Sequence, residues 1–374
     1  MRTGIQQGVV LVSRRQLVSE PAKVIVAVLA VGAAVALVLL LTGLRRGMGE
    51  QVTTYLRHQP PVLVGQEGTR NFLSQTSVLP AADVAQVSRV PGVAEVAPIT
   101  QDYAMLALHG KHILTVLVGY EPGGLGGPWA LARGRAPHDG EIVLDETLAQ
   151  EHGLTVGSLL DVRGAQLPVV GLSSGTSGFM TPLAFTTRST ANGLNGQPDT
   201  ATFLVVKPQP GVVPGALVSR INAAVPGVSA LGRDEVAAHD RNVFVGAFSG
   251  PLTAMTTIAA VVAILVIAIT IYSATRDRSR EYATLKAIGL TRAGLMRLVG
   301  FQSCVLALAG TAIGFLFALA GVRVVAALAP KYLIALTLRD AIVMVLATLV
   351  FALIAGLVPA RYLANLDPAT AFQR

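Results

Sequence analysis

Four runs of apolar residues are long enough to cross a lipid bilayer, and polar stretches separate them. The runs are residues 24–44, 252–273, 298–322 and 341–358, and Pro359 follows the last. A helix needs about 20 apolar residues to span the hydrocarbon core. Because backbone groups in hydrocarbon must pair within their own segment, each run is predicted to be a transmembrane helix.

The first run is longer than the apolar part of a typical signal peptide, which has roughly 7–15 residues. Arg45 and Arg46 follow it where a cleavage site would need small residues. We therefore expect this run to remain in the protein as a span.

Cations beside the runs predict the orientation. The segments 1–23, 274–297 and 359–374 share one side of a four-span chain, and the loop 274–297 alone holds six cations and two acids. The opposite connection, 323–340, holds three cations. Because Lys and Arg are enriched in cytoplasmic loops, both termini are predicted to be cytoplasmic, and residues 45–250 to lie outside. Arg45 and Arg46 oppose this assignment but are outnumbered.

Composition excludes several classes of protein. The 374 residues are 52% hydrophobic and 13% charged, against about 25% charged in an average soluble domain. Many of the cations behind the net charge of +8 flank the runs, which argues for topology signals and against a nucleic-acid partner. The one cysteine, Cys304, lies in the third run, so no disulfide framework can form.

The segment 45–250 contains two similar stretches, residues 81–93 and 215–228. In each, an apolar pattern of helical spacing meets Pro-Gly and then an apolar strand. Strand-like residues precede both, at 61–64 and 201–206. The pattern predicts a duplicated strand–helix–strand unit that forms one sheet with its helices on one face. The expected fold class is thus an α-helical membrane protein with four spans and an α+β external domain.

An insertion at about 120–189 separates the two units and is predicted to be mostly β. Residues 158–162 and 167–171 have strand-like patterns, and Arg163-Gly164 between them is typical of a turn. Glu141 begins a further strand, and a short helix follows that strand and ends at Gly153.

Catalytic and metal-binding motifs are weak. Residues 171–175 match G-x-S-x-G, but residues 176–182 do not form the helix start that this motif needs. A membrane-anchored hydrolase using Ser173 is therefore only an alternative. His109 and His112 have no apparent third ligand for a metal. No G-x-x-x-x-G-K-[ST] occurs, so we expect neither a bound cofactor nor an ATP site in this chain.

The spans hold no ionisable residue near a bilayer centre. An ion-coupled transporter would be expected to place some there. Gly310 and Gly314 form a G-x-x-x-G pair that allows close helix packing, either within the bundle or at a dimer face.

The loop 274–297 is predicted to be helical at its start. Tyr282, Leu285 and Ile288 recur near helical spacing, Gly289 suits the end of a helix, and Thr291 suits the cap of the next one. The cations indicate either topology signals attracted to anionic membrane lipids or a docking helix for a cytoplasmic partner.

The residues Arg-Glu-Tyr-Ala-Thr-Leu-Lys-Ala-Ile-Gly at 280–289 resemble the R-E-I-x-x-L-K-A-x-G signature of the MacB/FtsX-type ABC transporter permeases. The order of one span, a large external domain and three spans is similar to that family. So are the ending 359–369 and, in the insertion, Gly134-Arg135, residues 141–144 and residues 156–160. Tyr282 departs from the family, which has an aliphatic residue there.

The resemblance implies a permease subunit of an ABC-type export or extrusion complex in the bacterial inner membrane, without enzymatic activity of its own. A second permease chain, identical or different, would pair with it. Two copies of a separate ABC ATPase would bind ATP, and their motion would be passed to the external domain (mechanotransmission). The implied ATPase-docking residues are Arg280, Glu281, Lys286 and Gly289.

Three further points stay open within this resemblance. A periplasmic adaptor is a possible additional partner. The cargo is not specified, so efflux of lipids, lipoproteins, peptides, glycolipids or hydrophobic drugs fits equally. The alternative function is that of an FtsX-like transmembrane regulator, which uses the same motion to activate an external cell-wall hydrolase.

Overall fold

The computed structural model describes residues 21–75, 77–108, 111–179, 181–277, 281–282, 284 and 291–365. These residues form two compact units. The helical unit comprises the described parts of 1–46, 249–328 and 334–374, and the sheet domain comprises those of 47–248 and 329–333.

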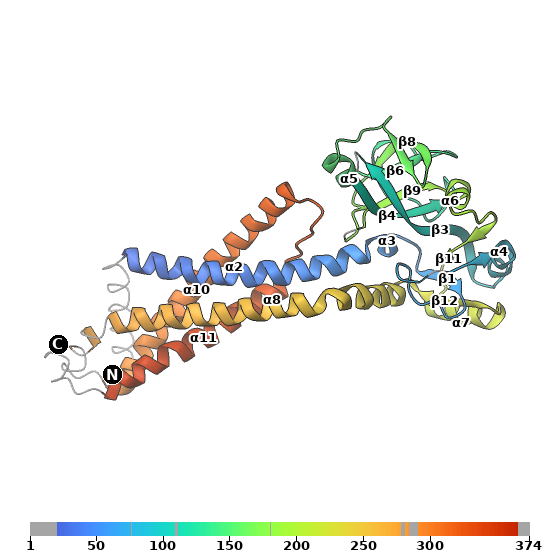
Figure 1. The fold of residues 1–374 in the computed structure, drawn as a ribbon. Coiled ribbons are helices and arrows are strands. Elements are labelled where there is room, and N and C mark those ends of the chain that lie inside the picture. Colours follow the sequence, from blue (N-terminus) through green and yellow to red (C-terminus); the bar gives the residue numbers. More distant parts are fainter. Residues whose placement is uncertain are drawn as a thin grey trace. The chain divides into compact units, whose positions relative to one another are not determined.

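Long helices make up the helical unit (Figure 1). They are α2 (Pro21–Val52), α8 (Arg233–Asp277), α10 (Arg292–Leu328) and α11 (Leu338–Asn365). Each contains a stretch long and apolar enough to cross a membrane: 24–52, 250–277, 292–328 and 338–357. These stretches include most or all of each predicted run, so the chain is a multi-pass membrane protein. Helices α2 and α8 continue beyond their apolar runs, and their outer ends belong to the sheet domain.

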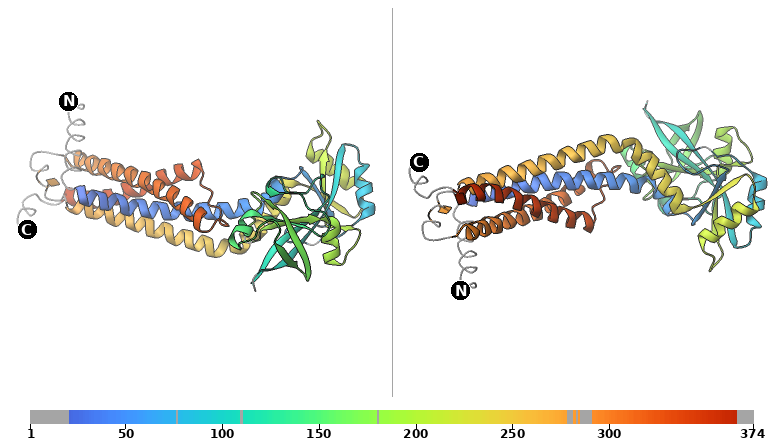
Figure 2. Two further views of the ribbon diagram at one scale, coloured as in Figure 1. Left: turned by 90° about the horizontal axis from the view of Figure 1, so that it is seen from above. Right: turned by 90° about the horizontal axis from the view of Figure 1, so that it is seen from below.

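Within the helical unit the four helices pack side by side, as both views of Figure 2 show. Their shared core consists mainly of small and branched residues, such as Ala27, Val31 and Val35 of α2, Ala307 of α10 and Ala352 of α11. Many large apolar side chains on the same helices are exposed instead. This arrangement is expected of helices whose outer surface meets lipid.

The sheet domain contains twelve described strands and five short helices. The strands are β1 (Val62–Gln66), β2 (Leu79–Pro80), β3 (Val93–Leu108), β4 (Lys111–Tyr120), β5 (Leu131–Gly134), β6 (Ile142–Asp145), β7 (Leu159–Val162), β8 (Ala165–Ser173), β9 (Leu183–Thr187), β10 (Thr200–Ala201), β11 (Phe203–Pro208) and β12 (Val228–Gly232). The helices are α3 (Thr54–Arg57), α4 (Ala81–Ser88), α5 (Glu146–Glu151), α6 (Arg188–Asn195) and α7 (Pro214–Ala224).

The predicted duplication is confirmed. One unit is β1–α4–β3, the other is β11–α7–β12, and their strands interleave in the order β12-β1-β11-β3. Strand β1 is antiparallel to β11 and β12, and β11 is antiparallel to β3. Each unit is therefore a split β-α-β motif with one strand of the other unit between its own two strands. Side chains of α4 and α7 pack on one face of these strands, where they share a core with Val62, Val64 and Val206.

The insertion is mostly β, as predicted. Strand β3 runs on beyond the duplicated sheet, and its residues 100–108 pair with β4. Strands β5 to β9 complete this second part of the sheet, with α5 as a short helix. Strands β7 and β8 form a hairpin whose two turn residues, Arg163 and Gly164, both have positive φ. That backbone matches a type I′ turn, whose twist suits a two-residue hairpin.

Candidate functional site: the loop 274–297 and the neck of helix α8

Most of the predicted docking residues lie outside the described part of the loop 274–297. Arg280, Lys286 and Gly289 belong to this group. Glu281 is described, and it is helical and exposed. An exposed acidic side chain is accessible to a partner, and the docking role of the four residues stays a prediction.

Tyr282 explains how this chain accommodates its departure from the family signature. Its side chain is only 2% exposed, and its hydroxyl donates a hydrogen bond of 2.6 Å to Oε1 of Gln302 on α10. The ring keeps the apolar face that an aliphatic residue would supply. The hydroxyl adds a polar bond between the loop helix and α10.

The other described end of the loop has the predicted cap. The backbone N–H of Gly294 donates to Oγ1 of Thr291 at 3.1 Å, and the N–H of Leu295 donates to the Thr291 carbonyl at 3.0 Å. Thr291 thus satisfies an N–H of the first turn of α10 that would otherwise lack a helical partner.

Gly310 and Gly314 of α10 lie against α2. A Cβ atom added at Gly310 would be 2.5 Å from Cγ1 of Val31, and one at Gly314 would be 2.7 Å from the carbonyl oxygen of Gly32. Neither distance leaves room for a side chain. The two glycines therefore lie in a close contact within the chain's own bundle.

An ion pair near the outer end of the bundle was missed by the sequence reasoning. Arg46 donates to both carboxylate oxygens of Asp340, at 2.7 and 3.0 Å, and also to Thr337. The Asp340 side chain is 12% exposed. This pairing neutralises one of the two cations that opposed the orientation. The partners are 294 positions apart, and local patterns cannot reveal such a pairing.

The outer end of α8 is part of the sheet domain, and we call its residues 233–248 the neck. Val236 and Ala237 of the neck are buried in a core with Tyr55, Phe72 and Phe203. The neck begins at Arg233, whose backbone N–H donates to the Pro61 carbonyl at 2.8 Å. The Arg233 guanidinium donates to the carbonyls of Gln59 at 2.9 Å and Arg57 at 3.3 Å. The neck is therefore joined to the segment that precedes β1.

Asp240 forms the deepest polar contact of the neck. Its side chain is 0% exposed. It accepts hydrogen bonds from the backbone N–H groups of Phe72 (3.1 Å) and Leu73 (3.2 Å to each oxygen) and from the Asn71 amide (3.2 Å). Removal from water outweighs these bonds and raises the pKa of Asp240 to about 6. A single carboxylate thus joins the neck to the loop at residues 71–73.

Comparison with known proteins places the chain in a family. Residues 24–224 match the MacB-like periplasmic core domain, and residues 253–368 match the FtsX-like permease C-terminal domain. The chain belongs to the MacB/FtsX-type ABC transporter permeases. This family also agrees with the observed architecture of four membrane helices and an α+β domain.

Relatives of this permease cover nearly all of it. An uncharacterised ABC transporter permease of Mycobacterium tuberculosis is 24% identical over 356 residues, which are 94% of this chain and 95% of the relative. A second one from the same organism is 26% identical over 357 residues, with the same coverage.

Two solved structures resemble part of this chain. The periplasmic region of MacB from Actinobacillus actinomycetemcomitans has a TM-score of 0.37 at 15% identity and covers 50% of this chain and 96% of its own. The extracellular domain of the noncanonic ABC-type transporter YknZ from Gram-positive bacteria has a TM-score of 0.36 at 11% identity, covering 46% and 98%.

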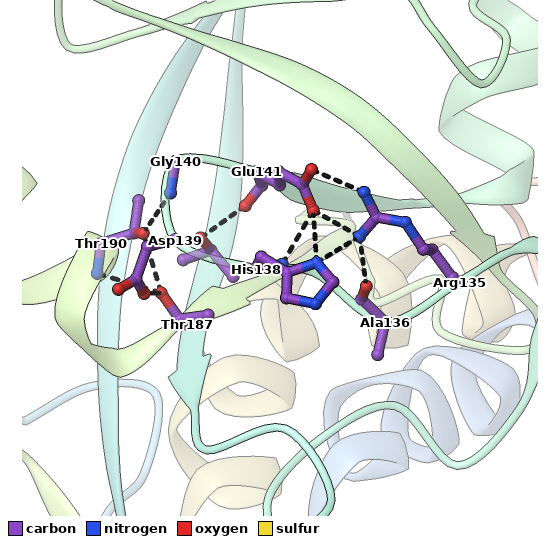
Figure 3. Close-up of polar contacts among 9 residues, drawn as sticks. Arg135, Ala136, His138, Asp139, Gly140, Glu141, Thr187 and Thr190 are labelled. Carbon is purple, nitrogen blue, oxygen red and sulfur yellow. Dashed lines mark hydrogen bonds and ion pairs between the residues drawn. The ribbon is translucent and has the colours of Figure 1, made fainter.

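Two of the residues that resemble the family, Arg135 and Glu141, meet in a polar corner of the insertion, drawn in Figure 3. Arg135 donates to both carboxylate oxygens of Glu141, at 2.5 and 2.6 Å, and the His138 N–H donates to the same carboxylate at 2.8 Å. The bond from Arg135 is the main reason why the pKa of Glu141 falls to about 2. Gly134 has φ +80°, and a Cβ there would be 2.2 Å from the Val170 carbonyl oxygen. The Gly-Arg pair thus has a structural role.

The hydrolase alternative finds no support in the surroundings of Ser173. Its side chain is 0% exposed, and its hydroxyl bonds to the Leu144 carbonyl (3.1 Å) and to Thr176 Oγ1 (2.6 Å). Thr176 in turn donates to Asp145, which caps α5. No helix follows Ser173 directly in the described chain. A nucleophile needs an adjacent base and access to substrate, and these bonds are instead those of a buried structural network.

No group of three metal-ligating side chains occurs among the described residues of this permease; His112 is exposed, and His109 lies outside the described residues. A cavity among Tyr55, Leu73, Phe179 and Phe244 has a volume of about 20 Å³. That volume holds about one water molecule, which is too small for a lipid or peptide cargo.

Proposed function

We propose that this permease passes ATP-driven motion of a separate ATPase subunit to its sheet domain, as the membrane subunit of an ABC-type export or extrusion complex. The sheet domain then lies outside the bacterial inner membrane, and both chain termini lie in the cytoplasm. Two ATPase copies and a second permease chain complete the minimal complex, and ATP is bound by the ATPase.

The observation that carries the proposal is the continuity of α8. This one helix has 45 residues, from Arg233 to Asp277, and a rise of 1.5 Å per residue makes it about 68 Å long. One end leads into the loop 274–297. The other end is the neck, whose Val236, Ala237 and Asp240 are buried in the sheet domain. The neck is joined to that domain through Arg233 and Asp240. A helix fixed at one end in this way can transmit a displacement from the other.

Two further features support transmission over passage of a cargo through the bundle. The spans carry no ionisable residue near a bilayer centre, although such residues commonly mark ion and substrate pathways. The chain also lacks the P-loop motif, which supports ATP binding by a partner.

The double variant Glu281→Lys and Gly289→Val tests the docking step. It reverses the charge of an exposed loop residue and constrains the predicted helix end. We expect the ATPase to be lost from the purified complex while the amount of permease in the membrane stays unchanged. Asp234→Lys, on the exposed surface of the sheet domain, is the matched charge reversal and should retain the ATPase. Undiminished co-purification of the double variant would contradict the docking role.

A further inference from the structure

We propose that Asp240 is the positioning residue that connects α8 to the sheet domain, and that protonation of its carboxylate releases this connection. The role given to Asp240 rests on the proposed function, because this contact would be the point where motion of α8 reaches the sheet domain. The contact itself does not depend on that function.

We call the contact between the Asp240 carboxylate and residues 71–73 the clamp. Both carboxylate oxygens of Asp240 are used, because Oδ1 accepts from Asn71 and Leu73 while Oδ2 accepts from Phe72 and Leu73. All these donors belong to residues 71–73. In these contacts each carboxylate oxygen faces only N–H donors. They therefore favour the charged carboxylate, in which both oxygens accept, over the protonated form, in which one oxygen is a donor.

The clamped segment leads directly into the rest of the domain. Leu73 accepts a hydrogen bond of 2.8 Å from the hydroxyl of Tyr103 on β3, and β3 is the strand that takes part in both halves of the sheet. The Phe72 ring is 1% exposed and stacks on Tyr55 at 4.9 Å. A displacement of Asp240 therefore acts on the centre of the aromatic core and on the longest strand.

Two other neck contacts, those of Arg233 and Arg241, differ in kind. Arg233 donates to main-chain carbonyls, and a guanidinium keeps its charge at every physiological pH. The stem of Arg241 lies over Gly49 of α2, where an added Cβ would be 3.2 Å from the Arg241 Cδ. Of these three contacts, only that of Asp240 changes with pH in the physiological range.

Among the described residues, His239, Arg70 and Tyr103 are ionisable neighbours of the clamp. His239 is the next residue on the neck, and its positive form favours the charged carboxylate. Its ring contacts the Arg70 carbonyl at 3.2 Å, so Arg70 of the clamped loop is a second neighbour. Tyr103 is the third, and burial together with the Asp240 charge raises the pKa of its hydroxyl to about 12. Tyr103 therefore stays neutral when Asp240 titrates.

Protonation has two opposite effects. The pKa of Asp240 is about 6 in the fold against 3.8 ordinarily, so the folded state binds this proton more tightly than the unfolded state. Protonation of Asp240 therefore stabilises the folded state most below pH 4, and this contribution is lost as the pH rises through 6. The clamp itself behaves in the opposite way, because a protonated oxygen becomes a donor that faces an N–H group. Acid should therefore loosen residues 71–73 without unfolding the domain.

Hydrogen–deuterium exchange of the full-length permease in lipid nanodiscs tests the clamp directly. After correction for intrinsic chemistry, the amides of Phe72 and Leu73 should exchange about tenfold faster at pH 5 than at pH 8, because charge-assisted bonds are lost. Asp240→Asn should show the faster exchange at both pH values. Asp234→Asn, the same change on the exposed first turn of the neck, should match the unaltered protein. A pH-independent profile of the unaltered protein would overturn the proposal.

A second measurement, on the complex with its ATPase, separates the clamp from the proposed function. With ATP, exchange should change in the neck and in residues 70–75 of the unaltered protein, but only in the neck of Asp240→Asn. An equal ATP-dependent change at 70–75 in Asp240→Asn would refute the positioning role. If ATP changes neither segment in the unaltered protein, the proposed function fails while the pH profile still decides whether the clamp exists.

Discussion

The two units of this permease build their cores from different residues. The sheet domain buries large side chains, among them Phe72, Phe185 and Phe203. The helical unit instead packs glycines and alanines, such as Gly32, Gly310 and Ala318. In water, removal of apolar area is the main driving force and large residues contribute most. In lipid that force is absent between helices, so close approach of backbones takes its place.

The threonines of the helices and the buried polar groups of the sheet domain also bond differently. In the helical unit, Thr256, Thr275, Thr311 and Thr348 each donate to the carbonyl four residues earlier on their own helix. In the sheet domain, buried polar groups bond across long sequence distances, as Thr100 does with Asn192 and Asp240 with Phe72. The helices can thus shift against one another without breaking these threonine bonds, whereas cross-linked parts of the sheet domain must move together.

The chain provides a separate reporter for each unit. Trp129 is the only tryptophan, and it packs against the aromatic core of the sheet domain. Cys304 is the only cysteine, and it lies on α10. Tryptophan fluorescence therefore follows the sheet domain, and thiol labelling follows the helical unit.

The largest effect is expected from Phe203→Ala. The Phe203 side chain is 1% exposed, and its ring lies 5.1 Å from that of Phe72. Removing a buried phenylalanine ring costs about 3–5 kcal/mol. Urea should unfold the sheet domain at a much lower concentration, as measured by Trp129 fluorescence.

The control for this variant is Leu159→Ala in the same domain, since Leu159 is 67% exposed. It should shift the transition by no more than about 0.5 kcal/mol. If Phe203→Ala altered Cys304 labelling as strongly as Trp129 fluorescence, the two units would not be separate in stability.

A smaller effect, confined to the helical unit, is expected from Gly314→Ala. The added Cβ would be 2.7 Å from the Gly32 carbonyl oxygen and 2.8 Å from the Val35 side chain. Overpacking of this kind costs about 1–3 kcal/mol. Cys304 should become more reactive toward a thiol reagent on warming, while Trp129 fluorescence stays unchanged.

Gly300→Ala on the same helix is the matched control, because its nearest added contact, to Leu353, would be 3.7 Å. It should leave Cys304 labelling unchanged. Equal labelling of the two variants would show that α2 and α10 do not depend on this close approach.

The sequence predicts those features that short-range patterns encode. Apolar runs locate the four spans, Pro-Gly after helical spacing locates both halves of the duplication, and Arg163-Gly164 locates the hairpin turn. In each case the residues that determine the structure are neighbours. The family signature at 280–289 is likewise local, because all of its residues are consecutive in the chain, and the docking role that it implies stays a prediction.

The neck of α8 was not predicted, because the residues near its end favour a helix boundary. Gly246, Gly250 and Pro251 together indicate a helix boundary, because proline removes a helical donor. The helix nevertheless continues through Pro251. Packing of Val236 and Ala237 against the aromatic core stabilises the turns before it. The contacts of Asp240 with Phe72 and of Arg46 with Asp340 join positions 168 and 294 apart, so they follow from the fold and not from any local pattern.

The smallest effect is expected at the cap of α10. Thr291→Ala removes the hydroxyl that accepts the Gly294 N–H, and the loss of such a cap costs about 1 kcal/mol. Like the threonines inside the spans, Thr291 bonds to its own helix, so the damage should stay local. Hydrogen–deuterium exchange should rise in residues 292–297 and not at Cys304 or in the sheet domain. Thr291→Ser keeps the hydroxyl and should retain protection. Faster exchange along the whole of α10 would mean that the bundle depends on its cap more than on its glycine contacts, and the contrast between the two units would then need another cause.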